Sequence, residues 1–304
     1  MTGPPRDLVG YGAAVPRVEW PGGARIAVNV VVNYEVGAER NPLDGDRDVE
    51  PLVDIAYAVP AGARDLHKES TYEYGSRVGV WRLLHLLDEL AVRPTIFGCG
   101  MAFERHPAVV AAFVERGCDA VGHGHRWIPH LGLDVAEQAA DIRACVDTLE
   151  RMTGRRVLGW FGRAPGTIDT RRLLAEAGLL YDCGAVNDDL PYFTDVEDRP
   201  FLVVPYSLDV NDVRFWRGEL LTGDHFETYV RDTFDVLYAE SARTPRMMSI
   251  GLHPRIIGRP GRLAGLRRAL EHIAAHPDVW FAGRDEIART WVEQFAPAGA
   301  WNLP

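Results

Sequence analysis

Short apolar runs alternate with amphipathic segments along most of the chain. The run at residues 25–33 (RIAVNVVVN) is mostly apolar and rich in β-branched residues, which is typical of a strand buried on both faces. Shorter runs of the same kind predict seven further strands, at 94–100, 118–122, 155–160, 179–183, 201–207, 247–253 and 279–283.

Between these runs, apolar positions recur with a helical period. They predict helices at 78–90, 107–117, 136–154, 170–178, 224–240 and 265–276, and a last helix from Asp285. Strands that alternate with helices of this length imply parallel strands joined by right-handed crossovers. The pattern favours a distorted (β/α) barrel of seven or eight strands, with a doubly wound open sheet as the alternative.

Two segments stand outside this alternation. Residues 1–24 are rich in Gly and Pro and lack periodicity, so we expect an arm that lies over the body of the protein. Residues 36–75 contain few periodic apolar positions and predict a long loop, a kind of segment that is usually functional within a compact domain. No linker divides residues 25–304, which predict a single domain.

The composition narrows the class of protein. The chain has 304 residues, 47% of them hydrophobic and 25% charged, with a net charge of −10, which argues against nucleic-acid binding. No stretch approaches the roughly 20 apolar residues of a membrane span, and the first residues lack the apolar region of a signal peptide. Four scattered cysteines do not make a disulfide framework. We expect a cytoplasmic protein that binds neither nucleic acid nor membrane.

Polar side chains that could take part in catalysis lie at the ends of the predicted strands. They are Glu35 after the first strand, His123 and His125 after the third, Arg163 after the fourth, Asp182 in the fifth and His253 at the end of the seventh. The carboxyl ends of parallel strands meet at one edge of a barrel or sheet, where active sites of such folds lie. We therefore expect one shared site.

The order of these segments resembles the motif series of the polysaccharide deacetylase (NodB-homology) superfamily. The matching positions are Glu35, His123, Arg163 with Pro165, residues 188–192 (DDLPY) and Leu252 with His253. The likeness covers about residues 20 to 296 and is nearest to the allantoinase-analogue branch, on phrases such as HGHRW, DDLPYF and PYSLDVNDVRF. It implies a catalytic barrel of the NodB type over residues 25–304, a hydrolase of non-peptide C–N amide bonds, and a homo-oligomer such as a tetramer.

The resemblance also raises the question of a metal. Deacetylases of this superfamily usually bind one divalent metal through an Asp and two His spaced four residues apart. Here Trp127 lies four residues after His123, and Val36 and Gly37 follow Glu35, so two of the three ligands are missing. We expect no tightly bound metal cofactor. The alternative is a Zn²⁺ site rearranged onto His123, His125 and His130.

Amide hydrolysis requires a base for water, donors for the oxyanion and an acid for the leaving nitrogen. We assign Glu35 as the base, with a pKa that desolvation can raise and an arginine partner would lower. Arg163 is expected to orient that carboxylate or to contact the substrate. His253 is the expected acid, and His123 is expected to stabilise the oxyanion.

Further residues are expected to contact the substrate, several of them by family analogy. They are Tyr34, Glu73, Tyr74, His125, Trp127 and Asp189. Arg255, Arg259 and Arg262 flank two glycines and are expected to be exposed loop arginines, with an anion site at a helix start as the alternative.

Three functions are compatible with these residues. The first is hydrolysis of a small cyclic amide or ureide such as allantoin. The second is metal-dependent deacetylation of N-acetylated sugars or peptidoglycan. The third is a catalytically silent barrel that binds carbohydrate. In each case the predicted partner is a small amide or an N-acetyl sugar.

Overall fold

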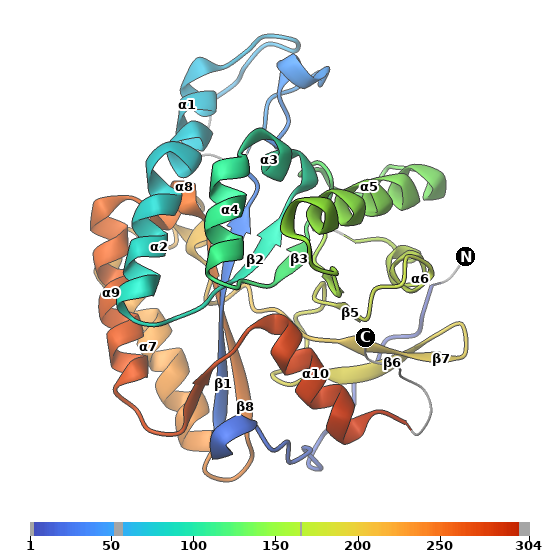
Figure 1. Ribbon diagram of the computed structural model, residues 1–304, viewed down its shortest axis with the longest axis vertical. Coiled ribbons are helices and arrows are strands. Elements are labelled where there is room, and N and C mark those ends of the chain that lie inside the picture. Colours follow the sequence, from blue (N-terminus) through green and yellow to red (C-terminus); the bar gives the residue numbers. More distant parts are fainter. Residues whose placement is uncertain (1–2, 52–56, 165, 298–304) are drawn as a thin grey trace.

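The computed structural model describes residues 3–51, 57–164 and 166–297, and Pro165 of the predicted Arg–Pro segment lies outside this part of the chain. A curled sheet with helices around it forms the body (Figure 1). Its nine strands are β1 (Ile26–Tyr34), β2 (Thr95–Gly98), β3 (Ala120–Gly122), β4 (Gly159–Trp160), β5 (Tyr181–Asp182), β6 (Tyr192–Val196), β7 (Arg199–Val203), β8 (Arg246–Leu252) and β9 (Val279–Phe281).

The strands follow the order β6-β7-β5-β4-β3-β2-β1-β8, and β9 also pairs with β1. All pairings are parallel except the antiparallel hairpin of β6 and β7. Within the described residues β6 and β8 do not pair with each other, so the barrel is incompletely closed. The prediction of a distorted (β/α) barrel is confirmed, and the eight predicted strands are joined by β6, which the pattern did not show.

Strand β1 is the centre of the sheet, and all nine of its residues are buried. Strand β8 pairs along residues 26–32 on one side of β1. On the other side β9 pairs with residues 26–28, and β2 pairs with residues 31–34. Val28 and Val30 on one face of β1 pack in one apolar cluster, and Ala27 and Val31 on the other face pack in a second. The prediction of a strand buried on both faces is confirmed.

The helices surround the sheet. They are α1 (Leu66–Tyr74), α2 (Val80–Glu89), α3 (Gly100–Arg105), α4 (Pro107–Glu115), α5 (Val135–Thr153), α6 (Thr170–Glu176), α7 (Gly223–Glu240), α8 (Pro254–Ile257), α9 (Pro260–Ala274) and α10 (Arg284–Phe295). None of the helices in the described part of the chain has the length and the apolar character to cross a membrane.

Helix α1 corrects part of the predicted loop at residues 36–75. Asp65 caps its amino end, where the Asp65 side chain accepts hydrogen bonds from the backbone N–H groups of His67 and Lys68. This is a common N-cap arrangement. A π-helical turn at residues 75–79 joins α1 to α2. A Cβ on Gly79 would lie 2.0 Å from the Pro254 carbonyl oxygen. Helix α8 therefore packs directly on this turn, and this contact fixes the chain that follows β8.

Candidate active site

Glu35 is the centre of a buried group of charged side chains. It follows β1 directly, and 1% of its surface is exposed. Its Oε1 lies 3.2 Å from Nε2 of His123 and 3.4 Å from Nε2 of His253, and its Oε2 lies 2.5 Å from Nη1 of Arg255. The ends of β1, β3 and β8 therefore meet at one carboxylate, as the order of the strands predicted.

His253 lies between two carboxylates. Its Nδ1 is 2.6 Å from Oδ1 of Asp212, a fully buried residue of a short 3-10 helix at 212–215. The other oxygen of Asp212 accepts the backbone N–H groups of His253 and Ile257. Burial by itself lowers the pKa of His253, but Glu35 and Asp212 outweigh it and raise that pKa to about 9. His253 is therefore an imidazolium near neutral pH and can act as a proton donor.

Two opposing effects were expected on the pKa of Glu35, and the effect of its charged neighbours is the stronger. Burial does act in that direction, but Arg255, His253 and His123 act against it and hold the pKa of Glu35 well below its usual range. Burial is the largest single effect, but the attraction to Arg255 and the contacts with the two histidines together exceed it. Glu35 is thus a carboxylate, and its strength as a base has to come from changes that occur when the substrate binds.

Arg255 occupies an aromatic cage. Its guanidinium carbon lies 4.5 Å from the ring centre of Tyr72 and 5.0 Å from those of Trp127 and Trp216. The side chain is fully buried, so it is not an exposed loop arginine. Its Nε and Nη2 have no hydrogen-bond partner among the described residues. Such a site favours a desolvated cation and leaves two N–H donors that can bind a polar ligand.

Arg163 does not have the predicted position beside Glu35. It forms a two-pronged ion pair with Glu50, at 2.5 and 2.7 Å, and donates a hydrogen bond to the Trp127 carbonyl. Its guanidinium also stacks 4.0 Å above the Trp127 ring. Trp127 therefore contacts both Arg163 and Arg255, and the arginine that orients Glu35 is Arg255.

His123 is held by the strand that follows it in the sheet. Its Nδ1 contacts the Phe161 carbonyl oxygen, and its ring stacks on that of Phe161 at 5.2 Å and 12°. A carbonyl oxygen only accepts hydrogen bonds, so Nδ1 carries a proton. The other nitrogen, Nε2, is thereby aimed at Glu35.

The alternative zinc ligands are not brought together. His123 faces Glu35, His130 lies 2.9 Å from Asp141, and His125 lies 4.0 Å from Glu104. The three imidazoles thus face three different carboxylates, and His125 does not reach the group around Glu35.

The position of the family's usual metal also does not suit a divalent ion. The guanidinium of Arg255 already lies against the carboxylate of Glu35. Trp127, at the place of the second histidine, offers no ligand atom. The positive charge beside Glu35 is therefore supplied by the guanidinium of Arg255, and the residues at this position do not fit a metal ion.

Three of the predicted substrate contacts point elsewhere. Tyr34 is next to Glu35 on an extended chain and faces the opposite side, where its hydroxyl lies 2.6 Å from His106. Glu73 is exposed on α1. Tyr74 donates to the Gly258 carbonyl, on the outer side of the π-helical turn. The residue of α1 that faces the site is Tyr72, which packs against Arg255. Its neighbours Glu73 and Tyr74 were predicted from the sequence instead.

Asp189 is also misplaced in the prediction. It lines a cavity together with Arg246, the first residue of β8. Glu35 lies beyond the opposite end of the parallel pair of β1 and β8, since Ile26 is the partner of Arg246. Asp189 therefore belongs to the amino ends of the strands and not to the site.

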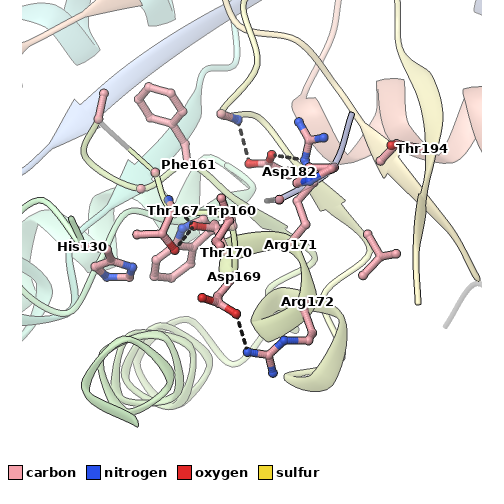
Figure 2. Close-up of a pocket in the computed structure, with 18 of the residues that line it drawn as sticks. His130, Trp160, Phe161, Thr167, Asp169, Thr170, Arg171, Arg172, Asp182 and Thr194 are labelled. Carbon is pink, nitrogen blue, oxygen red and sulfur yellow. Dashed lines mark hydrogen bonds and ion pairs between the residues drawn. The ribbon is translucent and has the colours of Figure 1, made fainter. Parts of the chain in front are cut away.

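A cavity of about 700 Å³ lies beside the buried group. Its lining includes His130, Phe161, Arg163, Arg171 and Asp182, and the last two form an ion pair at 3.0 Å (Figure 2). Glu35, His123, His253 and Arg255 do not line the cavity themselves. The wall residues Phe161 and Arg163 lie between, with Phe161 against His123 and Arg163 against Trp127. The volume is typical of pockets that bind small molecules.

Comparisons with known proteins place the chain in a family. The sequence profile described as polysaccharide deacetylase matches residues 67–181. A Schizosaccharomyces pombe protein, provisionally named a polysaccharide deacetylase, is 38% identical over 94% of this chain and 96% of its own length. A Pseudomonas aeruginosa structure with a provisional name of the same kind is 45% identical with a TM-score of 0.91, over 95% of this chain and 98% of that one.

A second solved structure, that of PuuE allantoinase, is 47% identical, with a TM-score of 0.91 and the same coverage of both chains. The likeness to these relatives extends over nearly the whole chain. This chain belongs to the polysaccharide deacetylase family, whose members are hydrolases of carbon–nitrogen amide bonds.

Proposed function

We propose that this protein hydrolyses a C–N amide bond in a small cyclic ureide, with allantoin as the first candidate. The observation that carries the proposal is the pairing of Glu35 with the caged Arg255, in the place where family members hold a metal. The likeness to PuuE allantoinase, at 47% identity, supports the same choice of substrate.

The proposed chemistry uses a water molecule and two proton transfers. Glu35 accepts a proton from the water as its oxygen attacks the carbonyl carbon. His253 gives its Nε2 proton to the nitrogen as the C–N bond breaks, and Asp212 keeps Nδ1 protonated. The Nε and Nη2 donors of Arg255 stabilise the negative oxygen, while His123, whose Nδ1 proton is bound to the Phe161 carbonyl, holds Nε2 against Glu35. Positioned acid–base groups of this kind typically contribute ~10²–10⁴-fold each.

The enclosure of the centre favours a small substrate. Glu35, His123 and His253 are each at most 5% exposed. A glycan chain requires a long open groove, whereas a ureide ring is of the size that the adjoining cavity of about 700 Å³ admits. The Nε and Nη2 donors of Arg255 match the carbonyl oxygens of such a ring.

A substrate panel on chelator-treated protein tests the proposal. The panel contains allantoin, hydantoins and N-acetylglucosamine oligomers, and His253→Gln serves as the inactive control. We expect turnover of a ureide that the chelator leaves unchanged. Release of acetate from the oligomers that is lost with chelator and restored by Zn²⁺ would instead establish the metal-dependent deacetylase. Glycan binding without any turnover would favour the silent barrel.

A further inference from the structure

Helices α7 and α9 lie side by side on the outside of the barrel (Figure 1) and bring three possible metal ligands together. Asp235 comes from α7, His272 lies in the last turn of α9, and His276 follows two residues after that helix ends. One ligand atom from each lies within 4.8 Å of the others. In the described part of the chain this is the one group of three His, Cys, Asp or Glu residues with that property.

His276 is oriented as a metal ligand before any metal binds. Its Nδ1 lies 2.9 Å from the His272 carbonyl oxygen, which can only accept, so Nδ1 donates and Nε2 keeps a free lone pair. The rings of Phe234 and Tyr238 pack edge-on against it, at 5.0 and 4.9 Å. A hydrogen bond from the second ring nitrogen is the usual way in which proteins fix the tautomer of a ligating histidine.

His272 and Asp235 already form a pair. Nε2 of His272 lies 2.7 Å from Oδ1 of Asp235, and both side chains are partly exposed, at 24% and 46%. A metal ion can replace the proton that the two share, and solvent can reach it from outside. The 2.7 Å between Nε2 and Oδ1 is shorter than the spacing of two ligands held at about 2.0–2.2 Å from one ion, so the pair has to open slightly when an ion enters, and rotations of these partly exposed side chains allow this.

The direction of the two helices adds to the attraction for a cation. Gly223 at the start of α7 approaches Gly265 in α9, and Asp235 further along α7 contacts His272. The helices therefore run in the same direction, and the site lies near the carboxyl ends of both. Helix carboxyl ends carry partial negative charge.

We propose that Asp235, His272 and His276 bind one divalent first-row transition metal ion, with Zn²⁺ as the probe. Two imidazole nitrogens and one carboxylate suit such an ion, whereas Ca²⁺ and Mg²⁺ prefer oxygen ligands. The ion links α7 to α9. The site precedes β9 and thus lies at the amino ends of the strands, away from Glu35, so it is independent of the proposed reaction.

Calorimetric titration of untagged, EDTA-stripped protein with ZnCl₂ tests this site. We expect the wild type to bind one equivalent and to melt at a higher temperature with Zn²⁺. Asp235→Asn and His276→Gln should each weaken binding at least tenfold and lose most of the shift in melting temperature. His85→Gln, an exposed histidine of α2, should bind as the wild type does, and so should Glu35→Gln.

Two outcomes would overturn the proposal. One is absence of binding by the wild type at Zn²⁺ concentrations that saturate a micromolar site. The other is binding that survives in both Asp235→Asn and His276→Gln. If that surviving binding disappears in Glu35→Gln, the ion lies inside the barrel. Circular dichroism of each variant separates loss of a ligand from loss of fold, because Asp235 is exposed and its replacement by Asn changes little else.

Discussion

The carboxylate of Asp212 holds His253 at two points, the imidazole Nδ1 and the backbone N–H of His253. One carboxylate oxygen lies 2.6 Å from Nδ1, and the other accepts the backbone N–H at 2.7 Å. A residue fixed in this way can neither rotate nor change its tautomer without breaking a buried hydrogen bond. The orientation of Nε2 toward Glu35 is therefore a property of the pair and not of His253 alone.

Replacing Asp212 by Asn should lower activity and shift its pH dependence. The negative charge of Asp212 contributes to the pKa of about 9 of His253. Without it the imidazolium loses its proton at lower pH, so the alkaline limb of kcat should move down, and kcat at neutral pH should fall by ~10²–10⁴-fold. A pH–rate profile measures both effects. An alkaline limb that stays in place would show that His253 is not the acid, provided that the melting temperature is retained.

The free energy of unfolding should be highest over a range of pH and should decline on both the acid and the alkaline side of that range. The folded pKa of His253 is raised, so its contribution is complete below its ordinary value of 6.5 and is lost as pH rises through about 9. The shift corresponds to about 3 kcal/mol. The folded pKa of Glu35 is lowered, so its contribution is complete above 4.5 and is lost as pH falls through the folded value.

Urea unfolding at a series of pH values measures this dependence. The free energy of unfolding should fall between pH 6.5 and 9 in the wild type, and His253→Gln should flatten that decline. An equal decline in the variant would mean that other groups control the alkaline side.

Glu35→Gln should destabilise the fold as well as abolish turnover. It leaves the guanidinium of Arg255 buried without its counter-charge, which typically costs about 3–5 kcal/mol. The double variant Glu35→Gln with Arg255→Met should recover part of that loss, because it removes the unpaired charge and keeps an apolar side chain in the cage. A double variant less stable than the sum of the single changes would contradict the pairing.

Arg163→Gln should affect substrate binding more than the chemical step. Arg163 lines the cavity and pairs with Glu50, while Arg255 contacts Glu35. We expect KM to rise about tenfold, equivalent to about 1.4 kcal/mol, with a smaller change in kcat. Arg163→Lys should behave like Gln, because a lysine cannot form the two-pronged pair. A fall in kcat at unchanged KM would show instead that Arg163 acts in the chemical step.

Much of the fold could be predicted from the sequence because the run at residues 25–33 is mostly apolar and rich in β-branched residues, which is typical of a strand buried on both faces. Strand β6 was missed for a local reason. Its hairpin turn uses Glu197 and Asp198 at positive φ of 50° and 62°, without the Asn-Gly or Asp-Gly pair that signals such turns.

The site was predictable where chemistry coincides with a strand end, as at Glu35, His123 and His253. It was not predictable where burial depends on distant aromatic residues. Arg255 is two positions after His253, yet its cage comes from Tyr72 and Trp216 in remote segments. Asp212 likewise acquires its role only when its 3-10 helix packs beside the end of β8.

The cation beside Glu35 is synthesised together with the polypeptide. An ion held by side chains has to be acquired after folding, competes with other ions for its ligands and leaves when supply falls. The guanidinium of Arg255 has none of these dependences, since it reaches its place as β8 and α8 pack. A cell that runs short of trace elements would therefore keep this charge in every folded copy of the protein.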